Sequence, residues 1–381
     1  MERNISILGS TGSIGVQSLD VARKMNFTVN AITANTDWKK TEEQIREFKP
    51  ALAAMADEEA AKKLRDAVKD TPTKVLSGIE GVCECAAYEK SDTVIDAIVG
   101  MAGLVPALTA LNNKKNLALA NKEALVAGGR LVLDAAKNNN VKILPVDSEH
   151  SAIFQCLEGK PTNQALKKII LTASGGPFFG KTKAELENVT AADALKHPTW
   201  DMGAKITIDS ASMFNKGLEL IEAHFLFGVA PENIDILVHR ESIIHSMIEY
   251  DDNSVIAQLG VSDMRIPIQY ALTYPERYPS PVKELDLSEI ATLTFYKPDY
   301  EVFDCLNICK EAISKGGLYP AAVNSANEEA NRLFRENKIK FTEIAPLIRT
   351  AFGVVKDTEC FTLEDIISTD RLARKAVLDA I

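Results

Sequence analysis

The sequence lacks the features that mark secreted, membrane-spanning and polyanion-binding proteins. None of its six cysteines forms a Cys-x-x-Cys pair, which argues against a disulfide framework. The longest apolar-looking run, residues 97–113, is broken by glycine, proline and asparagine and is too short to span a bilayer. Because the formal net charge is −10, nucleic acid is not an expected partner. The N-terminus runs almost straight into a strand-like segment, so we expect no signal or transit peptide and a cytoplasmic location.

The composition that remains is typical of an ordinary globular protein. The chain has 381 residues, of which 46% are hydrophobic and 25% are charged, so collagen-like and disordered classes are excluded. That length suggests two or three domains.

The first part of the chain, up to about residue 146, alternates short β-branched runs with longer helix-periodic ones. This alternation indicates a parallel, doubly wound sheet, in which ligands lie beyond the carboxyl ends of the strands. The predicted strands are residues 5–8, 28–33, 52–55, 74–76, 93–99, 117–120 and 141–146. The predicted helices include residues 14–25, 41–48, 58–68 and 123–137.

The pattern changes after residue 150. Strand-like runs at residues 168–172, 234–238, 246–250 and 255–259 mix with helical ones, and a proline-rich connector precedes a helical C-terminal part. We therefore predict an α/β fold with an N-terminal Rossmann-like parallel sheet, a central α+β domain and a C-terminal helical domain. The predicted boundaries are residues 1–147, 148–283, a linker at 284–303, and 304–381.

A glycine-rich turn, Gly9-Ser-Thr-Gly12-Ser-Ile-Gly15, follows the first predicted strand and opens the first predicted helix. Its glycines permit a tight turn, and the helix N-terminus offers N–H groups to a phosphate, so the turn favours a dinucleotide site over a purely structural role. The region after the second strand carries both an acid, Asp37, and two bases, Lys39 and Lys40, and leaves NADH and NADPH open.

Acidic residues follow the seventh predicted strand in Pro145-Val-Asp147-Ser-Glu149-His150. If Asp147 and Glu149 continue the strand, they present two carboxylates on the same face. Two carboxylates so close to each other repel unless a cation or a proton lies between them. The position at the end of a strand favours a metal ion. The alternative interpretation is a solvated loop with scattered acids.

A third group of polar residues lies between Asp209 and Glu219. If a helix begins near Asp209, one face of it carries Ser212, Asn215, Lys216 and Glu219. A polar stripe often faces solvent, but these groups near a helix N-terminus also suit a phosphate. Glu219 can supply a third carboxylate, and three oxygen donors suit Mg²⁺ or Mn²⁺ better than Zn²⁺.

Two loops complete the candidate site. Ser174-Gly-Gly-Pro177 ends a strand and exposes a hydroxyl group beside flexible backbone. His197-Pro-Thr-Trp200-Asp-Met202-Gly203 places an imidazole and an indole between proline and glycine. Although single His and Trp residues are more often packed in a core, a loop that holds both is a reasonable lid.

Taken together, these segments resemble the 1-deoxy-D-xylulose 5-phosphate reductoisomerase family over essentially the whole chain. The resemblance depends on residues 9–15, 121–123, 145–150, 174–177, 197–203, 209–219 and 258–267. It implies an NADPH- and divalent-metal-dependent rearrangement and reduction of 1-deoxy-D-xylulose 5-phosphate to 2-C-methyl-D-erythritol 4-phosphate, in non-mevalonate isoprenoid biosynthesis. It also implies a catalytic central domain with a lid, Mg²⁺ or Mn²⁺ as the metal, a homodimer, and no nucleic-acid or membrane partner.

The resemblance also implies roles for individual residues. The expected metal ligands are Asp147, Glu149 and Glu219, which with Lys122 form the expected catalytic set. The expected substrate contacts are Lys122, Ser148, Glu149, Ser174, His197, Ser210, Asn215, Lys216 and Glu219, with Trp200 and Met202 on the lid. The expected cofactor contacts are Thr11, Gly12, Ser13, Ile14, Asn35, Thr36, Asn121, Glu123 and Gly203.

The chain departs from the family pattern at two places. The family commonly has a base followed by Asn after the second strand, where this chain has Thr36-Asp37, so we expect a softened preference for NADPH. His239-Arg240-Glu241-Ser242 departs from the Pro-Gln that often precedes that Ser, with no obvious functional consequence.

Two other classes of protein remain as alternatives. Another nicotinamide-dependent dehydrogenase, acting on a phosphorylated hydroxy-ketone, would explain residues 1–150 but not the carboxylates or the phosphate helix. A nucleotide sensor would explain the glycine turn alone.

Overall fold

The computed structural model describes residues 3–158, 165–200, 202–356, 358 and 360–381. The chain forms two units, each of which is described by itself below. Unit 1 consists of Met1–Ala124, Arg130–Ser151 and Asp263–Val282, and unit 2 consists of Leu125–Gly129, Ala152–Ser262 and Lys283–Ile381. The three-domain boundaries expected from the sequence stay predictions.

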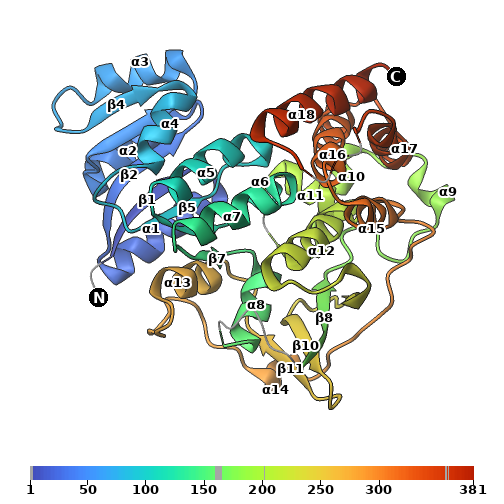
Figure 1. The fold of residues 1–381 in the computed structure, drawn as a ribbon. Coiled ribbons are helices and arrows are strands. Elements are labelled where there is room, and N and C mark those ends of the chain that lie inside the picture. The colour runs from blue at the N-terminus through green and yellow to red at the C-terminus, as the bar shows by residue number, and fades with distance from the viewer. Residues whose placement is uncertain (1–2, 159–164, 201, 357, 359) are drawn as a thin grey trace. The chain divides into compact units, whose positions relative to one another are not determined.

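Unit 1 is built on a seven-stranded, wholly parallel sheet, as the strand–helix alternation predicts (Figure 1). The strands are β1 (Asn4–Leu8), β2 (Thr28–Ala34), β3 (Leu52–Met55), β4 (Lys74–Ser77), β5 (Thr93–Asp96), β6 (Asn116–Leu119) and β7 (Ile143–Pro145). Their order is β4-β3-β2-β1-β5-β6-β7, so the winding direction reverses between β1 and β5. A crevice for a ligand is expected at that switch point, beyond the carboxyl ends of the strands.

Helices cover the sheet of unit 1. They are α1 (Ser13–Met25), α2 (Trp38–Phe48), α3 (Glu58–Ala67), α4 (Gly78–Ala86), η1 (Gly100–Gly103), α5 (Leu104–Asn112), α7 (Arg130–Asn138) and α13 (Arg265–Thr273). Helix α5 packs against both α4 and α7, whereas α1 packs on α13. Because parallel crossovers are right-handed, reversing the winding at β1 puts α1 and α4 on opposite faces of the sheet.

The prediction of a single helix at residues 123–137 is wrong, since two helices occupy this segment. Helix α6 (Lys122–Gly128) ends before Gly129, and α7 begins directly after it. Gly129 has a φ of +44°, and a Cβ there would lie 2.9 Å from the ring of Phe225. Both the backbone conformation and the close approach therefore require glycine, and they interrupt the helix.

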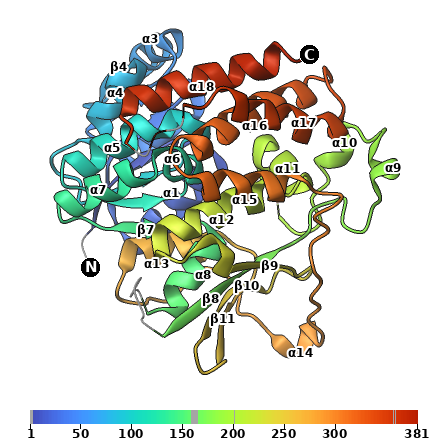
Figure 2. The same ribbon diagram turned by 45° about the vertical axis from the view of Figure 1, so that its right-hand side comes forward.

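Unit 2 contains a four-stranded mixed sheet, which agrees with the predicted α+β character. Its strands are β8 (Leu166–Ala173), β9 (Ile234–Val238), β10 (Ile244–Tyr250) and β11 (Val255–Leu259), in the order β11-β10-β8-β9 (Figure 2). Strands β8 and β9 are parallel, and β10 is antiparallel to both β8 and β11. The carboxyl ends of β8 and β9 therefore meet at the same edge of the sheet.

The helices of unit 2 come both from the predicted central domain and from the predicted C-terminal helical part. The longer ones are α11 (Ala204–Ala211), α12 (Phe214–Phe227), α15 (Cys305–Lys315), α16 (Tyr319–Arg335) and α18 (Leu363–Leu378). Helix α12 packs against β8, β9 and α15, and α16 packs against α18 and α11. The expected fold class is confirmed.

The prediction that a helix begins near Asp209 and continues to Glu219 is wrong. Helix α11 ends at Ala211, Met213 adopts a left-handed conformation with a φ of +61°, and α12 begins at Phe214. Ser212 therefore lies in a break between two helices and does not share a helical face with Glu219.

No helix in the described part of the chain combines the length and the apolar character needed to cross a membrane.

Candidate active site

The glycine-rich turn of unit 1 joins β1 to α1 at the switch point. Gly9 has a φ of +81°, and a Cβ there would lie 2.6 Å from the carbonyl oxygen of Ala97 at the end of β5. A Cβ on Gly15 would lie 2.2 Å from the carbonyl oxygen of Gly9. Gly12 caps α1 without a side-chain hydrogen bond. The first turn of α1 therefore offers backbone N–H groups that can donate hydrogen bonds to a phosphate.

The turn after β2 is held by Asp37, which caps α2 by accepting a hydrogen bond from the Lys40 N–H at 3.2 Å. The Lys40 ammonium reaches back to the glycine turn and donates to the carbonyl oxygen of Thr11 at 3.0 Å. Lys39 instead lies over the ring of Trp38. Lys40 is thus the base that connects this turn with the predicted phosphate loop, a distinction that spacing alone could not make.

The turn after β6 carries Asn121 and Glu123, both of which are buried. Asn121 Nδ2 donates to the carbonyl oxygen of Gly100 at 2.9 Å, and its Oδ1 accepts from the Ala124 N–H at 3.0 Å. These bonds tie the turn after β6 to the turn after β5. The two predicted cofactor contacts therefore lie in a buried turn at the carboxyl edge of the sheet.

Asp96, the last residue of β5, is a buried acid that the sequence analysis missed. Its Oδ1 accepts a hydrogen bond from the Ile98 N–H at 3.2 Å, while its Oδ2 has no hydrogen-bond partner among the described residues. Burial, together with the charge of Glu123, raises the pKa of Asp96 well above its usual value. An acid at the end of an apolar strand was the signal that could have identified it.

The carboxylates expected on a strand lie instead at a strand–helix junction. Strand β7 ends at Pro145, and Glu149 lies in the first turn of α8 (Ser148–Cys156), so the predicted alternation of Asp147 and Glu149 along a strand is wrong. The two acids still come together, because an oxygen of Asp147 and one of Glu149 lie within 4.8 Å of each other. The Ser148 hydroxyl donates to Glu149 Oε2 at 2.5 Å.

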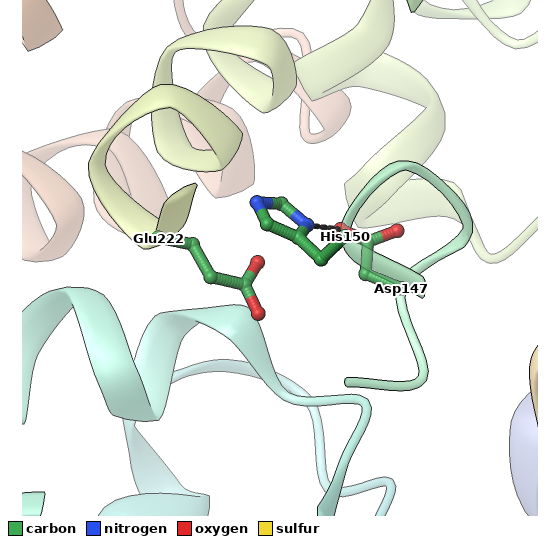
Figure 3. A group of neighbouring side chains, drawn as sticks. All are labelled: Asp147, His150 and Glu222. Carbon is green, nitrogen blue, oxygen red and sulfur yellow. Dashed lines mark ion pairs between the residues drawn. The ribbon is translucent and has the colours of Figure 1, made fainter. Parts of the chain in front are cut away.

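Asp147 lies beside an ammonium group and an imidazole within unit 1. The Lys122 ammonium lies 2.5 Å from its Oδ2. His150 Nδ1 lies 3.6 Å from the same oxygen, a contact that the dashed line in Figure 3 marks. Burial alone would raise the pKa of Asp147, but Lys122 and His150 outweigh it and hold that pKa well below its usual range. Asp147 is therefore an anion at neutral pH, as a metal ligand must be.

Three of the predicted residues lie together on α12 in unit 2. Asn215 Nδ2 donates to Oε1 of Glu219 at 2.5 Å, and the Lys216 ammonium donates to Oε2 of the same carboxylate. Lys216 and Glu219 are 4% and 1% exposed, so this charge pair is almost completely removed from water. Both side-chain oxygens of Glu219 are thus bound by an amide and an ammonium donor, which orient them as hydrogen-bonded ligands of a hard cation are oriented.

A second polar group in unit 2 joins three of the predicted substrate contacts. His197 Nε2 lies 2.9 Å from the Ser174 hydroxyl and 3.2 Å from the Ser210 hydroxyl. Its Nδ1 accepts hydrogen bonds from the backbone N–H groups of Thr199 and Trp200. Burial and the charge of Arg240 lower the pKa of His197 to about 4, so the ring is neutral near pH 7 and carries its proton on Nε2.

The lid residues are only partly connected to this group. The backbone of Trp200 binds His197, and the Trp200 ring lies 6.0 Å from the ring of His245. Gly203 precedes α11, and Asp201 lies outside the described residues. The lid function of Trp200 and Met202 and the cofactor contact of Gly203 stay predictions.

Arg240 is the functional candidate in unit 2 that the sequence analysis set aside. Its guanidinium donates to the carbonyl oxygens of Ser174 and Gly176, at 2.6 and 2.8 Å. The signal was present as a departure from the family pattern, but its meaning depends on the parallel pairing of β8 and β9.

The fold and these residues together define a class of protein. A glycine turn at the switch point of a parallel sheet is typical of nicotinamide-dependent oxidoreductases, and carboxylates at a strand end are typical of sites for hard divalent cations. The donors present are carboxylate oxygens held by ammonium and amide groups, so the residues of each unit fit such a cation.

Comparison with known proteins gives the particular family. Residues 5–129 match the family described as 1-deoxy-D-xylulose 5-phosphate reductoisomerase, residues 143–227 match its C-terminal domain, and residues 259–376 match the DXP reductoisomerase C-terminal domain. The 1-deoxy-D-xylulose 5-phosphate reductoisomerase of Acetivibrio thermocellus is 52% identical over 381 residues, covering 100% of both chains. That of Clostridium botulinum is 52% identical over 377 residues, covering 98% of each.

Solved structures agree with this result. The Zymomonas mobilis 1-deoxy-D-xylulose 5-phosphate reductoisomerase in complex with NADPH has a TM-score of 0.92 and 39% identity, covering 100% of this chain and 99% of that one. A DOX-P reductoisomerase in complex with NADPH, fosmidomycin and magnesium has a TM-score of 0.93 and 40% identity, covering 99% and 98%. The chain belongs to the 1-deoxy-D-xylulose 5-phosphate reductoisomerase family, and the resemblance stated from its motifs is confirmed.

Proposed function

We propose that the chain converts 1-deoxy-D-xylulose 5-phosphate to 2-C-methyl-D-erythritol 4-phosphate, with NADPH as the reductant and a divalent metal ion as the second cofactor. The observation that carries this proposal is the match to one family along the whole length of the chain. This reaction places the chain in non-mevalonate isoprenoid biosynthesis. The predicted cytoplasmic location stays a prediction.

The metal ligands in this proposal are Asp147 and Glu149 from unit 1 and Glu219 from unit 2. All three are carboxylates, a donor set that suits Mg²⁺ and also admits Mn²⁺. When bound, the metal ion would polarise the ketone and neighbouring hydroxyl of the substrate and stabilise negative charge during the rearrangement. Lys122 ion-pairs with Asp147, and Ser148 donates a hydrogen bond to Glu149. Because both side chains lie beside proposed metal ligands, they would orient the reacting end of the substrate.

The phosphate end of the substrate is assigned to unit 2. Its contacts would be Ser174, His197, Ser210, Asn215 and Lys216. The neutral His197 donates its Nε2 proton to a hydroxyl or phosphate oxygen, and the buried Lys216 supplies a positive charge. Because the phosphate is remote from the bonds that break, its binding energy can be used to hold the reacting end in position.

The cofactor is assigned to the switch point of unit 1. Thr11, Gly12, Ser13 and Ile14 place the N-terminus of α1 against the phosphates of NADPH. Asn35, Thr36 and the neighbouring Lys40 would surround the adenosine ribose, and Asn121, Glu123 and Gly203 would complete the site. NADPH supplies the hydride for the final reduction. The lid formed by Trp200 and Met202 would exclude water from the aldehyde that receives it.

A homodimer is part of the proposal. Strand β11 lies at the edge of its sheet, and Val255 and Ile256 on it are 50% and 43% exposed. An exposed apolar edge strand is a surface that a second copy can cover. Light scattering should give twice the mass of the chain, and Ile256→Lys should shift the equilibrium toward monomer.

The function is tested by identifying the product. Purified protein is mixed with 1-deoxy-D-xylulose 5-phosphate, NADPH and Mg²⁺, and the product is analysed by ¹³C NMR. The branched carbon skeleton of 2-C-methyl-D-erythritol 4-phosphate is the expected result. An unbranched reduced product would instead identify the alternative, a simple dehydrogenase of a phosphorylated hydroxy-ketone.

A further inference from the structure

Arg240 lies where two parallel strands end. Strands β8 and β9 pair in register up to Ala173 and Val238, so the residues that follow them meet at one edge of the sheet. From this position Arg240 Nη1 donates to two carbonyl oxygens of the Ser174–Gly176 turn, at 2.6 Å to Ser174 and 2.8 Å to Gly176. One cationic group therefore closes the turn that carries the Ser174 hydroxyl.

The turn itself has a backbone that only glycine adopts easily. Gly175 and Gly176 have φ values of +76° and +64°, and a Cβ on Gly176 would lie 2.8 Å from the carbonyl oxygen of Ser210. Because C=O and N–H of a trans peptide point in opposite directions, the Gly175 N–H points away from Arg240. Arg240 therefore holds the carbonyl groups of Ser174 and Gly176 on its own side of the turn.

The guanidinium of Arg240 is held in place by other groups of unit 2. It lies over the ring of Phe179 at 5.1 Å, and that ring packs on Tyr296. The neighbouring Glu241 binds the backbone and hydroxyl of Thr294 and lies 3.0 Å from His239 Nδ1. The hydrogen bonds of Glu241 thus go to Thr294, although its charge still acts on Arg240, and the positive charge of Arg240 acts in turn on His197.

We propose that Arg240 is a positioning residue for the phosphate end of the substrate: it clamps the Ser174–Gly176 turn so that the Ser174 hydroxyl meets His197, and its charge attracts the phosphate dianion. This inference rests on the proposed function, which assigns Ser174 and His197 to the phosphate. It gives a role to a position at which the chain departs from the common family pattern.

The test compares Arg240→Met and Arg240→Lys with the wild-type enzyme in steady-state kinetics. Arg240→Met removes both the clamp and the charge, so the KM for 1-deoxy-D-xylulose 5-phosphate should rise about tenfold, as expected for the loss of one charge-assisted interaction. The KM for NADPH should stay within about twofold, because Arg240 does not belong to the cofactor turn. Arg240→Lys keeps the charge and should recover part of the loss. Arg371→Met, which removes an exposed arginine from α18, is the matched control.

A second readout separates positioning from a general structural role. The His197 ring is followed by NMR with ¹³C-labelled histidine, as a function of pH and of added inorganic phosphate. In Arg240→Met the pKa of His197 should rise, because a repelling charge is gone, and the apparent affinity of inorganic phosphate should fall several-fold. If Arg240→Met does not fold, both measurements are made on Arg240→Lys, for which intermediate shifts are expected.

The inference is overturned if the variants melt at lower temperature but keep the wild-type substrate KM and the wild-type pKa of His197. It is also overturned if the KM values of substrate and NADPH rise equally. Failure of the proposed function looks different, because the wild-type protein itself would not consume NADPH with this substrate. In that case the phosphate titration of His197 still decides whether Arg240 supports an anion site.

Discussion

Asn215 Nδ2 lies 2.5 Å from Oε1 of Glu219, one helical turn further along α12. With Lys216 on the other carboxylate oxygen, a predicted phosphate contact and a predicted metal ligand are joined by direct hydrogen bonds. Binding of the substrate phosphate and binding of the metal ion should therefore influence each other. This coupling is a consequence of helical spacing, since residues three and four apart share a face.

Lys216→Ala should raise the KM for substrate more than tenfold, because it removes the buried lysine that is proposed to bind the phosphate. Turnover should fall as well, since Glu219 loses its ammonium partner. The control is Lys196→Ala, which removes a lysine whose side chain is 75% exposed and whose ion pair is with Asp193. If the substrate KM is unchanged while the NADPH KM rises, Lys216 does not belong to the phosphate site.

The turn after β2, which carries Thr36, Asp37 and Lys40, predicts a weak preference for NADPH over NADH. Asp37 places a carboxylate beside the expected 2′-phosphate, while the Lys40 ammonium already reaches the glycine turn. One ion pair near the surface is worth about 1 kcal/mol, or less than tenfold in affinity. Thr36→Arg should sharpen the preference by adding a bidentate phosphate ligand, and Asp37→Asn should do so by removing repulsion while keeping a helix cap.

The measurement is kcat/KM for NADPH and for NADH on each variant. Lys40→Ala should reduce the NADPH preference, whereas Lys39→Ala, which removes a cation that lies over Trp38, should change it little. A wild-type preference for NADH would contradict the assignment. If none of these changes alters the ratio, this turn does not touch the ribose.

Asp96→Asn should stabilise the protein at neutral and alkaline pH. Burial raises the folded-state pKa of Asp96 above the unfolded value of about 4, so wild-type stability falls as pH rises from that value toward the folded pKa. Asparagine mimics the protonated acid without this cost. Its gain in unfolding free energy should grow by about 1.4 kcal/mol per pH unit in that window.

Urea denaturation between pH 5 and pH 9 gives the comparison, with the exposed Asp134→Asn as control. A difference between Asp96→Asn and wild type that does not change with pH would show that Asp96 keeps an ordinary pKa.

Periodicity in the sequence predicted the seven strands of the unit 1 sheet and the four strands of the unit 2 sheet, because runs of β-branched residues are typical of buried strands. It was not enough at Met213, whose positive φ splits the helix expected from Asp209. Nothing local in Met-Phe-Asn-Lys predicts a left-handed residue, since this conformation is maintained by the packing of α11 and α12 on their neighbours.

The candidate site shows the same division. Motifs identified Ser174, His197 and Ser210 separately, but their hydrogen bonds join residues 13 and 23 positions apart and depend on the fold. Arg240 and Asp96 were missed for that reason: the first acts through two carbonyl groups on a parallel strand end, and the second through its burial. Long-range contacts with backbone groups produce no recognisable pattern of residue spacing in the sequence.

The central claim is that Glu219, together with Asp147 and Glu149, holds one divalent cation that turnover requires. Mn²⁺ binding followed by electron paramagnetic resonance tests it most directly, because it reports on the metal without relying on activity. The wild-type chain should bind one Mn²⁺ that Mg²⁺ displaces. Glu219→Gln should lose that site and its turnover while staying folded by circular dichroism, with a lower unfolding midpoint because the buried Lys216 loses its carboxylate partner. The exposed Glu232→Gln should behave as wild type. If Glu219→Gln binds Mn²⁺ with wild-type affinity, Glu219 is not a ligand and the account of the active site is wrong.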